Sequence, residues 1–188
     1  LNIPINLSPE ESVSMLNEKF FTFLFAPQYH ASMKHLAASR KNLGIRTMFN
    51  IIGPLVNPFE IHSQMIGIAD PSYAAPILMA SRSLGRDRVA VVHGYPLDEL
   101  SLHNAHSSLF VLHDDEIEEI QIRPDNTGLP ACNILDLLGS DPQHNAQIIR
   151  LIASKKEEGP KRDIVALNSG AALYVHGRAS TLKQGIEM

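Results

Sequence analysis

Residues 64–93 carry two short apolar runs separated by a helical pattern. The runs cover residues 64–69 and 88–93, and both are rich enough in apolar residues to be buried strands. Between them, Pro71 begins an apolar-periodic stretch that Gly85 ends. A strand, a helix and a strand within about thirty residues form a βαβ unit, in which the strands lie parallel and helices cover the sheet. We therefore expect an α/β fold with a mostly parallel sheet flanked by helices.

The N-terminal segment contains one strong helix start. The sequence Ser-Pro-Glu-Glu at residues 8–11 provides an N-cap serine, proline at N1 and glutamate at N3. The aromatic run over residues 20–25 is short and bounded by proline, which predicts a buried strand. Helical patterns follow over residues 29–40 and 45–55, with Gly44 as the break between them.

The C-terminal half predicts a hairpin followed by helices. Residues 109–112 and 117–122 are apolar runs on either side of an acidic turn, which indicates two antiparallel strands added at the sheet edge. Helices are predicted to begin at Asp141 and at Asp163, and Gly177 ends the second one.

The charge and cysteine content of the chain limit the classes of partner that it can be expected to bind. The chain holds 16 Lys and Arg against 20 Asp and Glu, a net charge of −4, and its basic residues are scattered. Binders of nucleic acid or anionic membranes gather positive charge, so we expect neither partner. The single cysteine, Cys132, has no internal disulfide partner, and no apolar run approaches the roughly 18 residues of a membrane span. We expect a cytoplasmic protein that binds small molecules. Because Leu1 replaces a starting Met and no signal peptide follows, we also expect an N-terminal part that is absent here.

Asp98 and Glu99 are the first candidates for chemistry, because they lie in the loop after the second strand of the βαβ unit. Ligands of open α/β sheets bind beyond the carboxyl ends of the strands. Mg²⁺ is usually held by one or two carboxylates and by substrate phosphates, so the pair suits a metal–diphosphate site. A solvated pair in a surface loop is the alternative. The 11 glycines form neither a dinucleotide fingerprint nor a Walker loop, so either this chain alone binds no phosphate or its phosphate-binding loop lies upstream of Leu1.

Other polar residues are weaker candidates. Arg40, ten residues after His30, is a planar partner for a carboxylate or a cation at a helix end. His103 and His106 lack carboxylates or cysteines at ligand spacing, so we interpret them as surface residues rather than metal ligands. Cys132 has no basic neighbour that would lower its pKa, and we expect no nucleophilic role for it.

Longer motifs carry a family resemblance. They are FLFAPxxHxxMK at residues 23–34, RKxLGIRTxFNxxGPLxNP at 40–58, VVHG at 91–94, LDE at 97–99, PDxxGLP at 124–130 and RDIVALNxxAALYVxG at 162–177. Together they closely resemble anthranilate phosphoribosyltransferase of tryptophan biosynthesis. The resemblance covers nearly the whole chain and matches about the C-terminal half of that enzyme.

The resemblance implies a glycosyltransferase reaction. The phosphoribosyl group of phosphoribosyl pyrophosphate passes to the amine of anthranilate, giving N-(5-phosphoribosyl)anthranilate and pyrophosphate, with Mg²⁺ as cofactor. By the same resemblance, Asp98 and Glu99 hold the metal. The positions that line or border the anthranilate channel are His30, Arg40, Gly53 and Pro54. Of these, the arginine takes the substrate carboxylate.

The fold implied is nucleoside phosphorylase/phosphoribosyltransferase-like, with a small helical domain hinged to a larger α/β domain. The family forms a homodimer through the helical domain. By this resemblance residues 29–55 belong to the helical domain, and residues 1–28 and 56–188 belong to the larger one. The glycine-rich diphosphate loop of the family lies upstream of Leu1, so we expect the isolated chain to be inactive.

Two other functions stay open. A non-catalytic paralogue of the same fold would bind nucleic acid, and the net charge of −4 and the intact motif around Gly53 argue against it. A pyrimidine-nucleoside phosphorylase of related fold would use phosphate as the acceptor and would not bind anthranilate.

Overall fold

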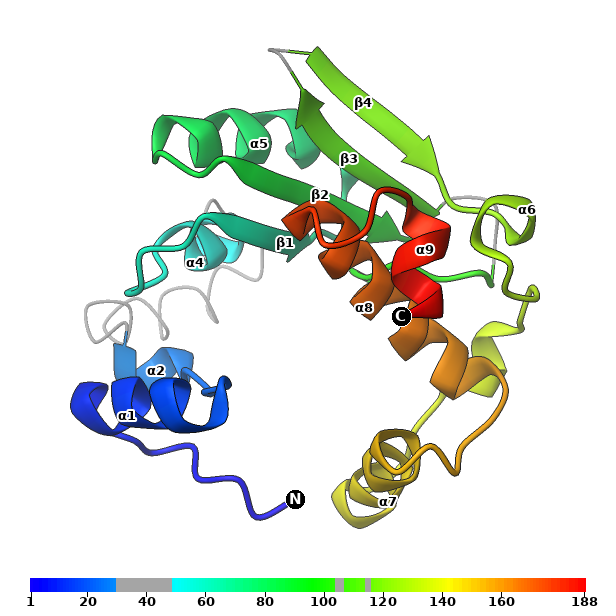
Figure 1. Ribbon diagram of the computed structural model, residues 1–188, viewed down its shortest axis with the longest axis horizontal. Coiled ribbons are helices and arrows are strands. Elements are labelled where there is room, and N and C mark those ends of the chain that lie inside the picture. Colours follow the sequence, from blue (N-terminus) through cyan, green and yellow to red (C-terminus); the bar gives the residue numbers. More distant parts are fainter. Residues whose placement is uncertain (30–48, 104–106, 114–115) are drawn as a thin grey trace, which may run out of the picture. The chain divides into compact units, whose positions relative to one another are not determined.

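The computed structural model describes residues 1–29, 49–103, 107–113 and 116–188 (Figure 1). They form two compact units, Leu1–Pro58 and Phe59–Met188, and each unit is described by itself. The assignment of residues 29–55 to a helical domain, and of residues 1–28 and 56–188 to a larger domain, stays a prediction.

Helix α1 of the first unit spans Pro9–Lys19. The Ser8 hydroxyl accepts a hydrogen bond from the N–H of Glu11 (3.2 Å), and the Glu11 carboxylate accepts one from the N–H of Ser8 (2.8 Å). This capping box pairs two donors that a helix start leaves open, and the predicted start is confirmed. The helix ends at Phe20, which has a left-handed backbone with φ 57°.

Residues 20–25 form no strand, so the prediction of a buried strand there is wrong. The left-handed conformation of Phe20 turns the chain at the end of α1, and helix α2 (Ala26–Tyr29) begins directly after the run. An extended segment becomes a strand only when a neighbour completes its hydrogen bonds, and the described residues of this unit contain no strand. Phe20 and Phe21 are instead 89% and 56% exposed.

Short helices complete the described part of the first unit. The hydroxyl of Tyr29 lies 2.5 Å from the hydroxyl of the buried Ser12, which ties α2 to α1. Helix α4 spans Phe49–Leu55, within the helix predicted over residues 45–55. Nearly all of the helix predicted over residues 29–40, and the break at Gly44, lie outside the described residues.

The second unit is built on a four-stranded sheet in the order β1-β2-β3-β4. The strands are β1 (Ser63–Gly67), β2 (Arg88–Gly94), β3 (Ser107–His113) and β4 (Glu116–Gln121). Strands β1 and β2 are parallel, with Met65 opposite Ala90. They are joined through the 3-10 helix η1 (Pro71–Tyr73) and helix α5 (Ala74–Ser83), which confirms the predicted βαβ unit.

The sheet is mixed, whereas the sequence favours a mostly parallel one. Strand β3 is antiparallel to both β2 and β4. A parallel pair needs a crossover of a dozen or more residues, usually helical. The described residues between β2 and β3 contain no helix, and β3 pairs with β4 up to His113 opposite Glu116. The α/β class and the hairpin at the sheet edge are confirmed.

Helices cover the sheet on both faces. Every residue of β2 after Arg88 is buried, so both of its alternating faces are covered. Helix α8 spans Pro160–His176, beginning three residues before the predicted position. It contributes Leu167 and Ala171 to the core that also contains Val92 of β2, and α5 packs against β2 as well.

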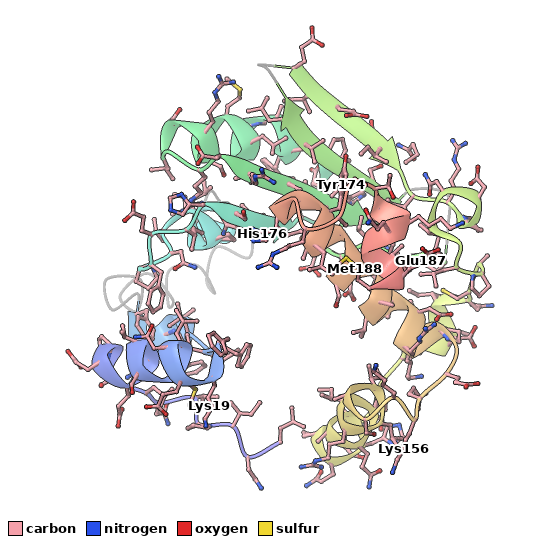
Figure 2. The ribbon with its side chains drawn as sticks, viewed as in Figure 1. Lys19, Lys156, Tyr174, His176, Glu187 and Met188 are labelled. Carbon is pink, nitrogen blue, oxygen red and sulfur yellow. The ribbon has the colours of Figure 1, made fainter. Side chains whose placement is uncertain are left out.

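The last turn of α8 is bonded to the starts of β1 and β2. Nδ1 of His176 lies 3.0 Å from the Ser63 hydroxyl, and the His176 carbonyl accepts a hydrogen bond from the Arg88 guanidinium (2.7 Å) (Figure 2). The other helical elements of this unit are α6 (Pro124–Thr127), η2 (Ile134–Leu137), α7 (Pro142–Ala153) and α9 (Leu182–Glu187). Asp141 caps α7 as predicted. Among the described residues, no helix has the length and apolar character needed to cross a membrane.

Candidate functional site

The loop after β2 places two carboxylates at the carboxyl ends of the parallel strands. Gly94 and Leu97 exchange backbone hydrogen bonds of 3.2 and 2.9 Å, which turns the chain back toward the sheet. A Cβ at Gly67, the last residue of β1, would overlap the carbonyl oxygen of Asp98. A Cβ at Gly94 would overlap the carbonyl oxygen of Glu99. Glycine at both strand ends therefore lets the loop lie directly on the sheet edge.

The carboxylate pair is exposed and electrostatically unfavourable on its own. Both Asp98 and Glu99 are exposed. Partial desolvation raises the pKa of Glu99 above its usual value, and the neighbouring charge of Asp98 raises it further. In the part of the chain that the structure describes, no group of three His, Cys, Asp or Glu side chains could hold a metal. The pair still fits Mg²⁺, because this ion commonly takes one or two carboxylates and completes its shell with water and substrate phosphates.

Leu100, the residue after Glu99, anchors the loop to α8. Its side chain is fully buried. Its N–H donates to Oδ1 of Asn168 (3.0 Å), and its carbonyl accepts from Nδ2 of Asn168 (2.8 Å). Asn168 could not be predicted as a partner of this loop from the sequence, because Leu100 lies 68 residues away. The only available signal is a side-chain amide next to Leu167, on the buried side of α8.

Inside the same loop, a side-chain hydrogen bond joins His103 to the main chain of Tyr95. Nε2 of His103 lies 2.8 Å from the Tyr95 carbonyl, and Nδ1 lies 2.7 Å from the Ser101 hydroxyl. Since a carbonyl only accepts, Nε2 carries the proton in the neutral ring and the hydroxyl donates to Nδ1. Both ring nitrogens of His103 are thus engaged within the protein, and His106 lies outside the described residues.

Burial raises the pKa of the Cys132 thiol, which favours its protonated form.

The predicted substrate residues fall in a different part of the chain. Gly53 and Pro54 lie in α4 of the first unit, and a Cβ at Gly53 would have no described atom within 4 Å. His30 and Arg40 lie outside the described residues. The structure places Asp98 and Glu99 together in one loop of the second unit, and the roles of all six positions stay predictions.

The family comparison gives a match over the whole chain. The family described as "Glycosyl transferase family, a/b domain" matches residues 1–188. The chain is 41% identical to the anthranilate phosphoribosyltransferase of Thermoanaerobacter sp. (strain X514), over 100% of this chain and 55% of that protein. It is 42% identical to the protein of the same name from Petrotoga mobilis (strain DSM 10674 / SJ95), over 99% and 54%. The chain therefore spans about half the length of these relatives.

Solved structures show the same similarity. Anthranilate phosphoribosyltransferase from Thermus thermophilus superposes with a TM-score of 0.88 at 34% identity, over 98% of this chain and 54% of that one. The Saccharomyces cerevisiae protein of that name, in complex with PRPP and Mg, superposes with a TM-score of 0.76 at 26% identity, over 93% and 50%.

Proposed function

Since this chain belongs to the glycosyl transferase family, a/b domain, we propose that its protein transfers the phosphoribosyl group of phosphoribosyl pyrophosphate to anthranilate. The products are N-(5-phosphoribosyl)anthranilate and pyrophosphate, in tryptophan biosynthesis. The observation that carries the proposal is the pair Asp98 and Glu99 at the carboxyl ends of β1 and β2, in a chain 41% identical to a named anthranilate phosphoribosyltransferase.

The residues suit a reaction that needs charge stabilisation more than base catalysis. The amine of anthranilate is neutral near pH 7, so no strong base has to generate the nucleophile. The C1–N bond forms as the C1–O bond to the diphosphate breaks, the amine then releases a proton, and pyrophosphate leaves. Asp98 and Glu99 would hold Mg²⁺, which when bound offsets the negative charge that develops on the departing diphosphate.

The acceptor side of the site rests on the resemblance. His30, Gly53 and Pro54 would line or border the anthranilate channel. Arg40 would hold the substrate carboxylate through its planar guanidinium, which matches two carboxylate oxygens at once. The same resemblance supports a homodimer in the cytoplasm with two small-molecule substrates.

The test follows anthranilate fluorescence in the full-length protein with phosphoribosyl pyrophosphate and Mg²⁺. We expect the fluorescence to fall only when both are present. The double variant D98N/E99Q should transfer on the order of 100-fold more slowly, and the exposed control E158Q should match the wild type. The 188-residue chain alone should show no fall. A full-length wild type that leaves anthranilate unchanged but cleaves pyrimidine nucleosides with phosphate would overturn the proposal.

A further inference from the structure

Asn168 of α8 binds the main chain directly after the carboxylate pair. It accepts from the N–H of Leu100 at 3.0 Å and donates to the carbonyl of the same residue at 2.8 Å. A side-chain amide has a donor and an acceptor side by side, so it pairs with one residue's backbone as a neighbouring strand would. We propose that Asn168 is a positioning residue for the metal-binding pair Asp98 and Glu99, an inference that rests on the proposed function of this pair.

The Asn168 side chain has a single orientation. Its Nδ2 also donates to the carbonyl of Ile164 (2.9 Å), one turn earlier in α8. Both partners of Nδ2 are carbonyls, which only accept, so nitrogen and oxygen cannot be exchanged. The helix itself is fixed, because Leu167 and Ala171 are buried in the core on either side of this position. Asn168 therefore gives the loop a rigid point of attachment.

The peptide group between Glu99 and Leu100 is held at both ends. Its carbonyl oxygen packs on Gly94, where no Cβ would fit, and its N–H is bound by Asn168. Because a peptide group is planar, holding its two ends fixes the plane and the direction in which the chain leaves Glu99. The main chain that carries the exposed Glu99 carboxylate is therefore held in a fixed position.

A merely stabilising contact and a positioning contact differ in what a substitution changes. The Leu102 carbonyl of the same loop accepts a hydrogen bond from the Cys132 N–H (3.1 Å), so the loop keeps this attachment when Asn168 is replaced. If Asn168 only adds stability, its loss lowers the melting temperature and leaves metal binding intact. If it positions the carboxylates, its loss weakens metal binding in molecules that are still folded.

The test replaces Asn168 by Leu in the full-length protein, since leucine has a similar volume and makes no side-chain hydrogen bonds. Ser169→Ala, at the exposed neighbouring position, is the matched control. Mn²⁺ is titrated while the paramagnetic broadening of the Asp98 and Glu99 amide resonances is followed, and the Mg²⁺ requirement of anthranilate transfer is measured in parallel. We expect N168L to need about tenfold more of either ion, with KM for anthranilate changed less than about twofold. S169A should match the wild type.

Equal Mn²⁺ titrations of N168L and the wild type would overturn the proposal, whatever happens to the melting temperature. If circular dichroism shows that N168L does not fold, N168A replaces it, because the smaller side chain leaves room for water to bind the main chain of Leu100. An Mn²⁺ titration of N168A equal to that of the wild type would likewise overturn the proposal. A wild type that binds Mn²⁺ at the loop but transfers nothing to anthranilate refutes the proposed function alone. A wild type that binds no Mn²⁺ there overturns both.

Discussion

The adjacent carboxylates of Asp98 and Glu99, in the loop after β2, disfavour each other's charged form. Desolvation raises the pKa of Glu99, and the negative charge of Asp98 adds to the shift. Each effect disfavours the charged form of the Glu99 carboxyl, and a bound cation would relieve both. The residue is therefore better suited to binding a divalent ion than to stabilising the fold.

Replacing Glu99 by Gln is expected to raise the melting temperature near pH 8 when divalent ions are absent. A carboxyl whose pKa is higher in the folded than in the unfolded state binds its proton more tightly when folded, so wild-type stability falls as pH rises between the two pKa values. Glutamine resembles the protonated carboxyl and carries no such penalty. The advantage of E99Q should be full above the raised pKa and vanish below about pH 4, under the unfolded value.

Scanning calorimetry with EDTA between pH 4 and pH 8 checks this expectation. E158Q, at an exposed glutamate far from the pair in sequence, controls for the general effect of removing a surface charge. An E99Q variant that melts below the wild type at pH 8 would show that the carboxylate stabilises the folded chain. With excess Mg²⁺ the wild type should gain stability by ion binding, and E99Q should gain less.

At the scale of elements, the loop after β2 depends on the glycines that end β1 and β2. The Asp98 carbonyl occupies the space where a Gly67 side chain would be. Since this carbonyl is a backbone atom, it cannot rotate away as a flexible side chain would. The strand end and the carboxylate loop therefore form one packed element.

Gly67→Ala is expected to lower the free energy of unfolding by about 1–3 kcal/mol, because the added methyl group displaces the loop. The same variant should also bind Mn²⁺ more weakly. Urea denaturation measures the first effect. G53A is the matched control, because no described atom would lie within 4 Å of its Cβ and alanine is the better helix former. An equal loss of stability in both variants would contradict the steric explanation.

Elements that depend on local chemistry could be predicted from the sequence. The Ser8 capping box, the βαβ unit around Pro71 and the antiparallel pairing of β3 with β4 all depend on residues close together in the chain. The carboxylate pair could be placed at the sheet edge because the order of the elements implies it. The structure of residues 20–25 could not be predicted, because apolar character does not indicate whether a neighbouring strand exists. The role of Asn168 depends on a partner 68 residues away, which no periodicity reveals.

At the scale of the whole molecule, the first unit leaves apolar side chains in solvent. Phe20, Phe21 and Phe23 are 89%, 56% and 44% exposed, and Ile3 and Val13 are 44% and 45% exposed. Single exposed apolar residues are ordinary on protein surfaces, whereas three phenylalanines within four positions are not. Water contact at these rings is costly, so association that buries them is favoured.

The isolated 188-residue chain is therefore expected to self-associate as its concentration rises. The variant F20N/F21S should shift the chain toward monomer, since it removes the two most exposed rings. Asparagine is chosen at Phe20 because it tolerates the left-handed backbone that ends α1, so the helix end is kept. N17S/K19S, at exposed polar positions of the same helix, is the control. Size-exclusion chromatography with light scattering, up to about 100 µM, measures the mass.

A wild-type chain that stays monomeric would contradict the expectation. Association that persists unchanged in F20N/F21S would show that other exposed apolar side chains make the contact, among them Leu135 and Leu138 of the second unit, which are 68% and 58% exposed.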